Sequence, residues 1–263
     1  MRLDQTLVYR GLLPSRERAK AAILAGEVTV NGAEERKPSR EIHDADALAL
    51  RETHSYVGRG YLKLRKALDV FAIDVAGKVC MDIGASTGGF TQLLLERGAA
   101  KVYAIDVGTG QLAASLRDDP RVVGLEKTDF RAVTAEQVGP CEFACADVSF
   151  ISLQRILPNL HALLGENGRA VCLIKPQFEV GSPVKHGIVK DPKEHIRVIG
   201  EVIRAARGMG FTCLDLTYSP IAGVDGNIEY LLFLSKNDNP EKNNDKYLSI
   251  NDIVNQAWKE LRG

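Results

Sequence analysis

Residues 78–236 alternate short apolar runs with longer amphipathic segments, and this alternation limits the fold more than any other feature of the sequence. Two of the intervening segments predict helices, Leu153–Leu164 and Pro192–Met209, and Asp191 is a suitable N-cap for the second. Alternating strands and helices form a mostly parallel sheet that is covered on both faces. We therefore expect an α/β domain. Its seven strands are predicted at Val79–Ile83, Val102–Ile105, Val122–Leu125, Phe143–Ala146, Ala170–Ile174, Thr212–Tyr218 and Tyr230–Leu234.

The first 58 residues predict a separate, small α+β domain. Apolar residues recur there at helical spacing, and Asn31-Gly32 is the favoured dipeptide of a tight β-hairpin. A chain of 263 residues is long enough for one ordinary domain and such an appendage. The expected elements are a helix from Leu3 that stops at Gly11, a helix over Arg16–Ala25, a strand at Val28–Val30 and a strand at Ala47–Arg51.

Positive charge gathers near the start of the chain, although the whole sequence is neutral, with 34 Lys+Arg against 34 Asp+Glu. Residues 1–26 carry five cations against Asp4 and Glu17, and residues 58–66 carry four cations and no acid. Such clusters form either a solvated surface or an RNA-facing patch, and charge alone does not separate the two. The candidate RNA-binding residues are Arg2, Arg10, Arg16, Arg18 and Lys20 in the first domain and Arg59, Arg65 and Lys66 in the basic linker and leading helix at 59–77.

A glycine-rich turn, residues 82–91 (Asp-Ile-Gly-Ala-Ser-Thr-Gly-Gly-Phe-Thr), follows the first predicted strand. It is not a dinucleotide fingerprint, because Ser86 occupies the position of the middle glycine. It is not a Walker loop either, because Phe90 stands where that motif requires lysine. An acid at Asp82 would repel a diphosphate, whereas a cationic amino-acid ligand suits the turn.

Carboxylates follow the next two predicted strands. Asp106 ends the second strand, the expected place for an acid that binds ribose hydroxyls, and Asp129 follows the third, where an acceptor could meet an adenine amino group. Ligands of open parallel sheets bind beyond the carboxyl ends of the strands. The glycine turn and the two acids in this order predict S-adenosylmethionine as the ligand, although each acid alone would equally suit a solvated strand end.

Lys175 directly ends an apolar strand, which is unusual because burial penalises its charge unless the charge is paired. Asp147 is the expected partner, since it ends the fourth strand and this strand should neighbour the fifth. Glu229 begins the last strand, and Lys63 lies in the basic segment before the sheet. Location and partner both favour a functional site at Lys175 over a structural ion pair.

Residues 82–91, 146–152 and 175–179 closely resemble the corresponding segments of FtsJ-like ribose methyltransferases. Residues 1–58 resemble the alpha-L RNA-binding module of a small-subunit ribosomal protein. Together they make the chain similar to the TlyA family, ribosomal RNA 2′-O-methyltransferases that often carry a hemolysin label. The resemblance covers residues 1–236 and implies a Rossmann-like methyltransferase sheet at 78–236. Residues 237–263, a polar linker and an amphipathic helix, lie outside it.

The resemblance implies both an activity and a site. The activity is methyl transfer from S-adenosylmethionine to a cytidine ribose of ribosomal RNA, with ribosomal RNA or ribosomal subunits as partners. The catalytic tetrad carries over to Lys63, Asp147, Lys175 and Glu229, although Tyr61 replaces a glycine that the family has just before the first lysine. The implied cofactor-binding residues are Asp82, Gly84, Ser86, Thr87, Gly88, Gly89, Phe90, Asp106, Asp129 and Asp147.

A ribose hydroxyl is a poor nucleophile near neutral pH, so the protein must orient it and remove its proton. We assign Lys175 as the base, with Asp147 and Glu229 orienting the lysines and Lys63 helping to place the substrate. Lys175 must be neutral to accept a proton. The nearby positive charge of Lys63 favours the neutral amine, whereas Asp147 and Glu229 favour the ammonium, and the sequence does not decide between these effects. The reaction requires no metal. Residues 176–191 predict a mobile loop beside the site.

Two other functions compete with this hypothesis. One is a catalytically silent RNA-binding protein. The intact tetrad and the glycine turn argue against that function. The other is a membrane-active hemolysin. Three features argue against it: the neutral net charge, the lack of an apolar run of roughly 20 residues, and the charged N-terminus. We expect a cytoplasmic, soluble protein without stable membrane insertion, whose five cysteines are buried and reduced.

The end of the chain predicts an amphipathic helix behind a polar linker at 237–248. A single short helix is marginal in water, so its apolar face needs a partner. We expect this helix to dock on the catalytic domain with Trp258 as its anchor, or else on a second copy of the chain in self-association. The apolar face consists of Ile250, Ile253, Val254, Ala257, Trp258 and Leu261.

Overall fold

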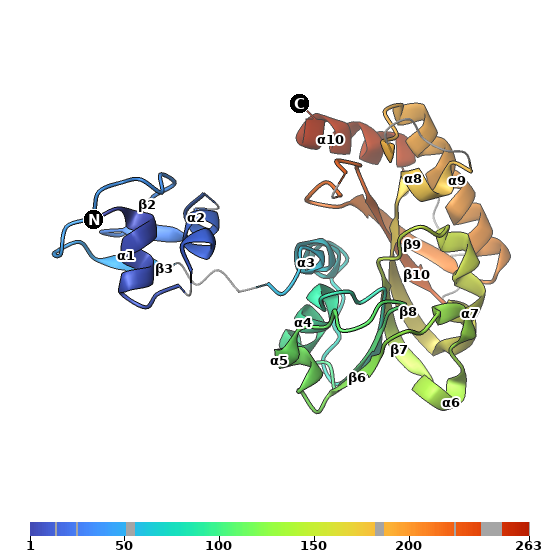
Figure 1. Ribbon diagram of the computed structural model, residues 1–263. Helices are drawn as coiled ribbons and strands as arrows, with labels where there is room; N and C mark the ends of the chain where they lie inside the picture. The colour runs from blue at the N-terminus through green and yellow to red at the C-terminus, as the bar shows by residue number, and fades with distance from the viewer. Residues whose placement is uncertain are drawn as a thin grey trace. The chain divides into compact units, whose positions relative to one another are not determined.

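The chain forms two compact units, Met1–Tyr56 and Val57–Gly263 (Figure 1). Each unit has its own apolar core. The computed structural model describes residues 1–13, 15–24, 26–50, 56–181, 187–223, 225–237 and 249–262. Several expected features fall partly outside these ranges. They are the last residues of the helix and strand predicted to end at Ala25 and Arg51, residues 182–186 of the predicted loop, and residues 238–248 of the polar linker.

The first unit combines two helices with a three-stranded antiparallel sheet of order β2-β1-β3. Asn31 and Gly32 adopt positive φ angles of 53° and 81°, as a tight turn between β1 and β2 requires. Leu3, Leu7 and Ile23 of the helices are fully buried in the core. The elements are α1 (Leu3–Tyr9), α2 (Arg16–Leu24), β1 (Val28–Val30), β2 (Ala33–Glu34) and β3 (Leu48–Leu50).

The second unit is built on a seven-stranded sheet of order β6-β5-β4-β7-β8-β10-β9. Neighbouring strands from β6 to β8 are parallel, and β10 is antiparallel to both β8 and β9. The prediction of a mostly parallel sheet is therefore confirmed. The strands are β4 (Val79–Ile83), β5 (Lys101–Ile105), β6 (Val122–Leu125), β7 (Cys141–Ala146), β8 (Leu164–Ile174), β9 (Thr212–Tyr218) and β10 (Tyr230–Ser235).

Helices cover both faces of this sheet, with α3 and α4 on one side and α7 and α9 on the other (Figure 1). All five cysteines of the chain are buried as free thiols, in agreement with the expectation. The helices are α3 (Gly60–Val70), α4 (Gly89–Glu96), α5 (Ala114–Arg117), α6 (Ala135–Val138), α7 (Leu157–Leu163), α8 (Pro176–Glu179), α9 (Pro192–Gly208) and α10 (Ile250–Arg262), with 3-10 turns η1 (Phe130–Ala132) and η2 (Leu153–Arg155).

One predicted helix is interrupted. The segment Leu153–Leu164 forms η2 and then α7, with Pro158 in the first turn of α7. Pro158 has no N–H to donate to the carbonyl of Gln154, so the hydrogen bonds of one α-helix cannot run unbroken from η2 into α7. Leu164 already belongs to β8, which begins earlier than the predicted strand at Ala170.

The C-terminal helix α10 docks within the chain, against α9 and β9 (Figure 1). Val254 and Ala257 are fully buried, and the other four residues of the predicted apolar face are partly buried against the same core. Trp258 is partly buried in this contact, edge-on to the buried His195 at 5.5 Å between ring centroids. The face that would serve a second copy of the chain is thus covered intramolecularly.

Strand register decides which residues meet at the carboxyl edge of the sheet. The parallel strands β4, β5, β7 and β8 end there, and the antiparallel strand β10 begins there because Tyr230 pairs with Ile174. Glu229 and Lys175, the flanking residues, are therefore brought to the same edge although they are far apart in sequence.

Candidate active site

The glycine turn between β4 and α4 adopts a backbone that side chains rarely allow. Gly84 and Gly88 have φ angles of 83° and 95°, and Ser86 also lies in the left-handed region at 47°. A Cβ atom on Gly84 would lie 2.6 Å from the carbonyl oxygen of Asp147. Glycine is therefore required at this position, where the turn and the end of β7 approach each other.

Asp82 supports the turn from behind. Its Oδ2 atom accepts hydrogen bonds from the backbone N–H of Thr91 at 2.9 Å and from the Thr91 hydroxyl at 2.7 Å. The side chain is buried, and burial raises the pKa of the carboxyl group to about 7. Asp82 and Gly88 do not line either of the two pockets described below, whereas the other cofactor residues implied by the sequence do.

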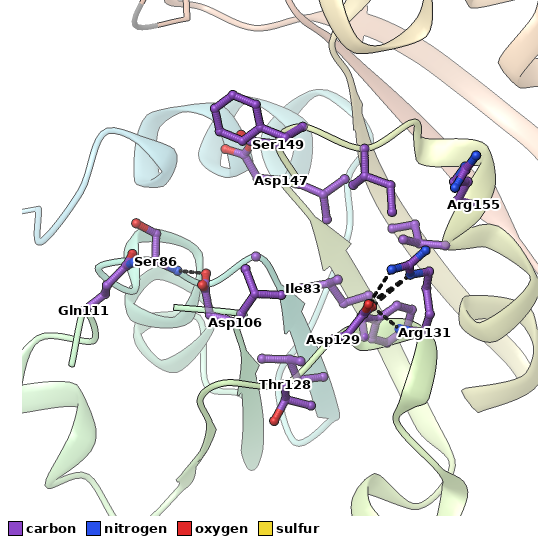
Figure 2. Close-up of a pocket in the computed structure, with 18 residues that line it drawn as sticks. Ile83, Ser86, Asp106, Gln111, Thr128, Asp129, Arg131, Asp147, Ser149 and Arg155 are labelled. Carbon is purple, nitrogen blue, oxygen red and sulfur yellow. Dashed lines mark hydrogen bonds and ion pairs between the residues drawn. The ribbon is translucent and has the colours of Figure 1, made fainter. Parts of the chain in front are cut away.

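A pocket of about 590 Å³ opens beyond the ends of β4, β5 and β6 (Figure 2). Its size is that of a site for a small molecule or cofactor. Asp106 ends β5 at this pocket, where its carboxylate accepts hydrogen bonds from the backbone N–H groups of Ser86 at 2.8 Å and Gly108 at 2.7 Å. The turn and the strand end are thus held together at the position predicted for ribose.

Asp129 reaches the same pocket but is already paired. Its carboxylate accepts from the Arg131 guanidinium at 2.5 Å and from the Arg131 backbone N–H at 3.0 Å, as Figure 2 shows. The Arg131 side chain holds the pKa of Asp129 below its usual range. Arg155 also lines the pocket. Sequence reasoning missed both arginines, although the position of Arg131 two residues after Asp129 was a usable signal.

The four residues of the predicted tetrad meet at the edge of the sheet. The Lys63 ammonium lies 3.0 Å from Asp147 Oδ2 and 2.7 Å from Glu229 Oε2, and the Nζ atom of Lys175 lies 2.6 Å from Asp147 Oδ1. All four side chains are largely buried, with Glu229 only 2% exposed. Asp147 is thus shared by two lysines, and Lys63 by two carboxylates.

Charge pairing outweighs burial in this cluster. Burial by itself would lower the pKa of Lys63, but Asp147 and Glu229 raise it above its ordinary value. Burial would likewise raise the pKa of Asp147, but Lys63 and Lys175 hold it below its ordinary value. Lys63 is therefore an ammonium and Asp147 a carboxylate at neutral pH.

A second pocket contains Lys175 and opens between the glycine turn and the ends of β7 and β8. Lys175 also donates a hydrogen bond to the Ser149 hydroxyl at 2.9 Å. Phe150, which is 92% exposed, and Phe178 flank this pocket with their ring centroids 5.2 Å apart. Ser149, Phe150 and Phe178 were not among the predicted site residues, although Ser149 and Phe150 closely follow Asp147 and the strand end.

The two pockets meet at shared residues. Both are lined by Gly84 and Ser86 of the turn and by Asp147, Ser149 and Phe150 after β7. Asp147 therefore connects the first pocket to the lysines, because it lines that pocket and contacts both Lys63 and Lys175. This arrangement can hold two reactants side by side, with the titratable groups at their junction.

The cations predicted to face RNA have different surroundings. Arg2 and Arg16 both pair with the buried Asp4, at 3.0 and 3.1 Å. Arg10 donates to the backbone carbonyls of residues 43, 44 and 46. Arg18 and Lys20 are exposed on α2.

The predicted RNA-binding cations near α3 are partly buried or bonded within the second unit. The Lys66 ammonium lies 3.4 Å from the centre of the Tyr218 ring, and burial lowers its pKa. Arg59 donates to the carbonyl of Ala222, and Arg65 is half-buried.

The fold and the site define a methyltransferase, in which a parallel sheet with one antiparallel strand carries a ligand pocket and a polar cluster at its carboxyl edge. The model of the FtsJ-like methyltransferase family matches residues 56–236, and that of the S4 domain matches residues 1–48. The chain belongs to the TlyA group of FtsJ-like methyltransferases.

Individual relatives cover nearly the whole chain. The 16S/23S rRNA (cytidine-2′-O)-methyltransferase TlyA of Mycobacterium tuberculosis is 46% identical over 89% of this chain and 89% of its own length. The Bacillus subtilis protein YqxC, which carries an rRNA methyltransferase name, is 49% identical over 89% of this chain and 85% of its own. A solved structure from Streptococcus thermophilus that carries a hemolysin name has a TM-score of 0.77 at 44% identity, covering 100% of this chain and 97% of that one.

The hemolysin names do not correspond to a membrane-spanning helix here. Among the described residues, no helix is both long and apolar enough to cross a bilayer.

Proposed function

We propose that this methyltransferase transfers the methyl group of S-adenosylmethionine to the 2′-hydroxyl of a cytidine in ribosomal RNA. The observation that carries the proposal is the buried cluster of Lys63, Asp147, Lys175 and Glu229 beside the glycine turn. The name of the M. tuberculosis relative, with its cytidine-2′-O activity on 16S and 23S rRNA, supports the nucleotide and the substrate. The S4 domain supports a contact with RNA.

The first pocket fits S-adenosylmethionine. Gly84 and Ser86 of the glycine turn line it, and Asp106 stands where ribose hydroxyls would need acceptors. The Asp106 carboxylate, which accepts from neutral backbone N–H groups, suits a ligand that carries a sulfonium and an ammonium group. Bound there, the cofactor supplies an activated methyl group. Asp82 would contribute indirectly, by holding the turn through Thr91.

Lys175 would act as the base. Its Nζ atom contacts Asp147 and Ser149, which line both pockets. There it would take the proton of the 2′-hydroxyl as the oxygen displaces the sulfur of the cofactor from the methyl carbon. Asp147 and Ser149 hold that atom in place, at 2.6 and 2.9 Å. Lys63 stays charged between Asp147 and Glu229, so part of the negative charge of these two carboxylates is already compensated.

The first unit would supply affinity for RNA. Its exposed cations Arg18 and Lys20 are suited to phosphate contacts, and Arg2, Arg10 and Arg16 would contribute positive charge while remaining tied to their own unit. Phosphate contacts fix the position on RNA without reading sequence, so selection of the cytidine would depend on RNA shape and on the second unit.

The test is to incubate the purified protein with labelled S-adenosylmethionine and separated ribosomal subunits, and then to map the modified nucleotide by mass spectrometry. The expected product is a cytidine methylated on its ribose, with no product from the Asp147→Asn variant. Label on a nucleobase, or no transfer to any ribosomal RNA, would refute the proposal.

A further inference from the structure

Glu179 is a buried carboxylate that the reaction itself does not use. It ends the short helix α8, four residues after Lys175, and is 9% exposed. Its Oε2 atom accepts a hydrogen bond from the Ser152 hydroxyl at 2.7 Å, and its Oε1 atom accepts one from the backbone N–H of Leu153 at 2.7 Å. Both donors belong to the segment that follows β7.

The two segments that Glu179 joins are those that carry Asp147 and Lys175. At the site they are linked by the Lys175 contacts to Asp147 at 2.6 Å and to Ser149 at 2.9 Å. Glu179 provides a second link farther along both segments. Two connections between a pair of loops fix their relative position, whereas one would allow them to pivot.

Each end of the second link is itself ordered locally. The Ser152 hydroxyl accepts from the backbone N–H of Gln154 at 3.2 Å and so caps η2. On the other side, the backbone N–H of Phe178 donates to the carbonyl of Lys175 at 2.9 Å within the turn of α8. A displacement of Glu179 would therefore be transmitted to Lys175 through a short, hydrogen-bonded turn.

Burying a carboxylate between two loops carries a desolvation cost. Burial raises the pKa of Glu179, and the hydrogen bonds from Ser152 and Leu153 oppose that rise. The groups that donate to it, a hydroxyl and an amide, are neutral, so these bonds differ from the ion pairs of the tetrad. A carboxylate has two oxygens that can accept from two donors in fixed directions, which an apolar contact cannot do.

We propose that Glu179 is a positioning residue, which holds the Lys175 segment against the Asp147 segment and so sets the place of Lys175 Nζ relative to the substrate hydroxyl. This inference rests on the proposed role of Lys175 as base. It adds a requirement for turnover that lies outside both pockets, since Glu179 lines neither.

The experiment compares three full-length variants by single-turnover methyl transfer at saturating RNA and S-adenosylmethionine. Glu179→Ala removes both acceptors and should lower the rate about 10- to 100-fold, because a small misplacement of a catalytic group has effects of this size. Glu179→Gln keeps one acceptor and an amide that can donate to the Ser152 hydroxyl, so it should restore most of the rate. Glu166→Gln, at an exposed position of β8, is the matched control and should keep the wild-type rate.

Binding and stability measurements separate positioning from general damage. Calorimetric affinity for S-adenosylmethionine and the apparent KM for RNA should stay within about twofold of wild type in Glu179→Ala, since the positioning role acts on the rate alone. A wild-type rate in Glu179→Ala overturns the proposal, and so does a Gln variant as slow as the Ala variant. If Glu179→Ala melts below the assay temperature, Ser152→Ala takes its place; removing one of the two bonds should slow turnover severalfold, and an unchanged rate overturns the proposal.

A parallel measurement on Lys175→Ala distinguishes failure of the positioning role from failure of the base assignment. If Lys175→Ala is inactive and Glu179→Ala is as fast as wild type, only the positioning role fails. If Lys175→Ala itself turns over at the wild-type rate, the assignment of the base fails.

Discussion

At the scale of single residues, Asp147 has the central electrostatic role. Its two oxygens face two lysines, at 3.0 Å from Lys63 and 2.6 Å from Lys175. These contacts outweigh the effect of burial and hold its pKa below the ordinary value of 3.8. A carboxylate with a lowered pKa stabilises the folded state above the pKa of the unfolded chain, and that contribution is lost as the pH falls through the folded value.

Replacing Asp147 with Asn should therefore destabilise the second unit in a pH-dependent way. The loss should be roughly 3 kcal/mol near pH 7, because the variant leaves two lysines short of a partner. It should shrink below about pH 3.8, where protonation removes the same charge from the wild type. Urea titrations of both proteins between pH 3 and 7 measure this difference, and a difference that does not change with pH would count against the lowered pKa.

Asp82 shows the opposite shift, since burial raises its pKa to about 7. Its folded-state proton stabilises the protein at acid pH, and this contribution disappears as the pH rises through about 7. Asp82→Asn keeps an acceptor for Thr91 without the charge, so its stability relative to wild type should increase from pH 5 to pH 8, by at most about 1.4 kcal/mol per pH unit. The exposed Asp118→Asn is the control in the same melts. A constant Asp82→Asn difference would show that the carboxyl group is ionised throughout.

At the scale of elements, the strand pattern predicted the sheet, and the ends of the strands predicted most of the site. Lys175 and Asp147 could be paired from the sequence because they end strands that neighbour each other in such a sheet. Phe150 could not be predicted, because its position depends on loop conformation rather than on periodicity. Arg131 had a local signal in its place two residues after Asp129, but its ion pair depends on a side-chain rotamer. The break before α7 follows from Pro158, a local signal that a prediction from helical periodicity alone overlooks.

The docking of α10 also depends on how neighbouring helices and strands pack. The sequence predicted its apolar face, but not that Val254 and Ala257 would be its fully buried residues. Trp258 instead lies edge-on to His195, whose ring nitrogens bond to the Tyr230 hydroxyl at 2.8 Å and to the Val189 carbonyl at 3.0 Å. The helix thus packs on α9 and β9, with Trp258 against His195 of α9.

The single tryptophan reports on this docking. Trp258 should emit at blue-shifted wavelengths with partial protection from quenchers, and the spectrum should not change with protein concentration, because the contact is within the chain. Trp258→Ala should lower the unfolding free energy by about 3 kcal/mol, since it removes a large side chain from the packed face of the helix. Emission like that of free tryptophan, or a shift that grows with concentration, would contradict intramolecular docking.

At the scale of the whole molecule, the chain joins an S4 domain to a methyltransferase unit, each with its own core. The sequence predicted both units because each has its own pattern of apolar residues. It did not predict which cations would be engaged within their own unit, since Arg2 and Arg16 are adjacent in space to Asp4 only after folding. The exposed pair on α2, Arg18 and Lys20, is the more direct candidate for RNA binding.

Removing that pair should weaken RNA binding through electrostatics. The Arg18→Ala/Lys20→Ala variant should bind ribosomal RNA less tightly and with a smaller slope of log affinity against log salt, by about 0.7–0.9 for each phosphate that the protein no longer neutralises. Arg36→Ala, which removes an exposed cation paired with Glu34, is the matched control and should leave the slope unchanged. Equal slopes for the double variant and wild type would exclude these two side chains from the interface.

The central claim is that Lys175 removes the proton of a ribose hydroxyl in ribosomal RNA. It is tested most directly by single-turnover methyl transfer to ribosomal subunits, with Lys175→Ala beside wild type and calorimetric S-adenosylmethionine affinity measured on both. We expect the rate to fall by about 10²–10⁴-fold, the usual contribution of a general base, while cofactor affinity is retained. Transfer to the same cytidine at the wild-type rate by Lys175→Ala would contradict the claim.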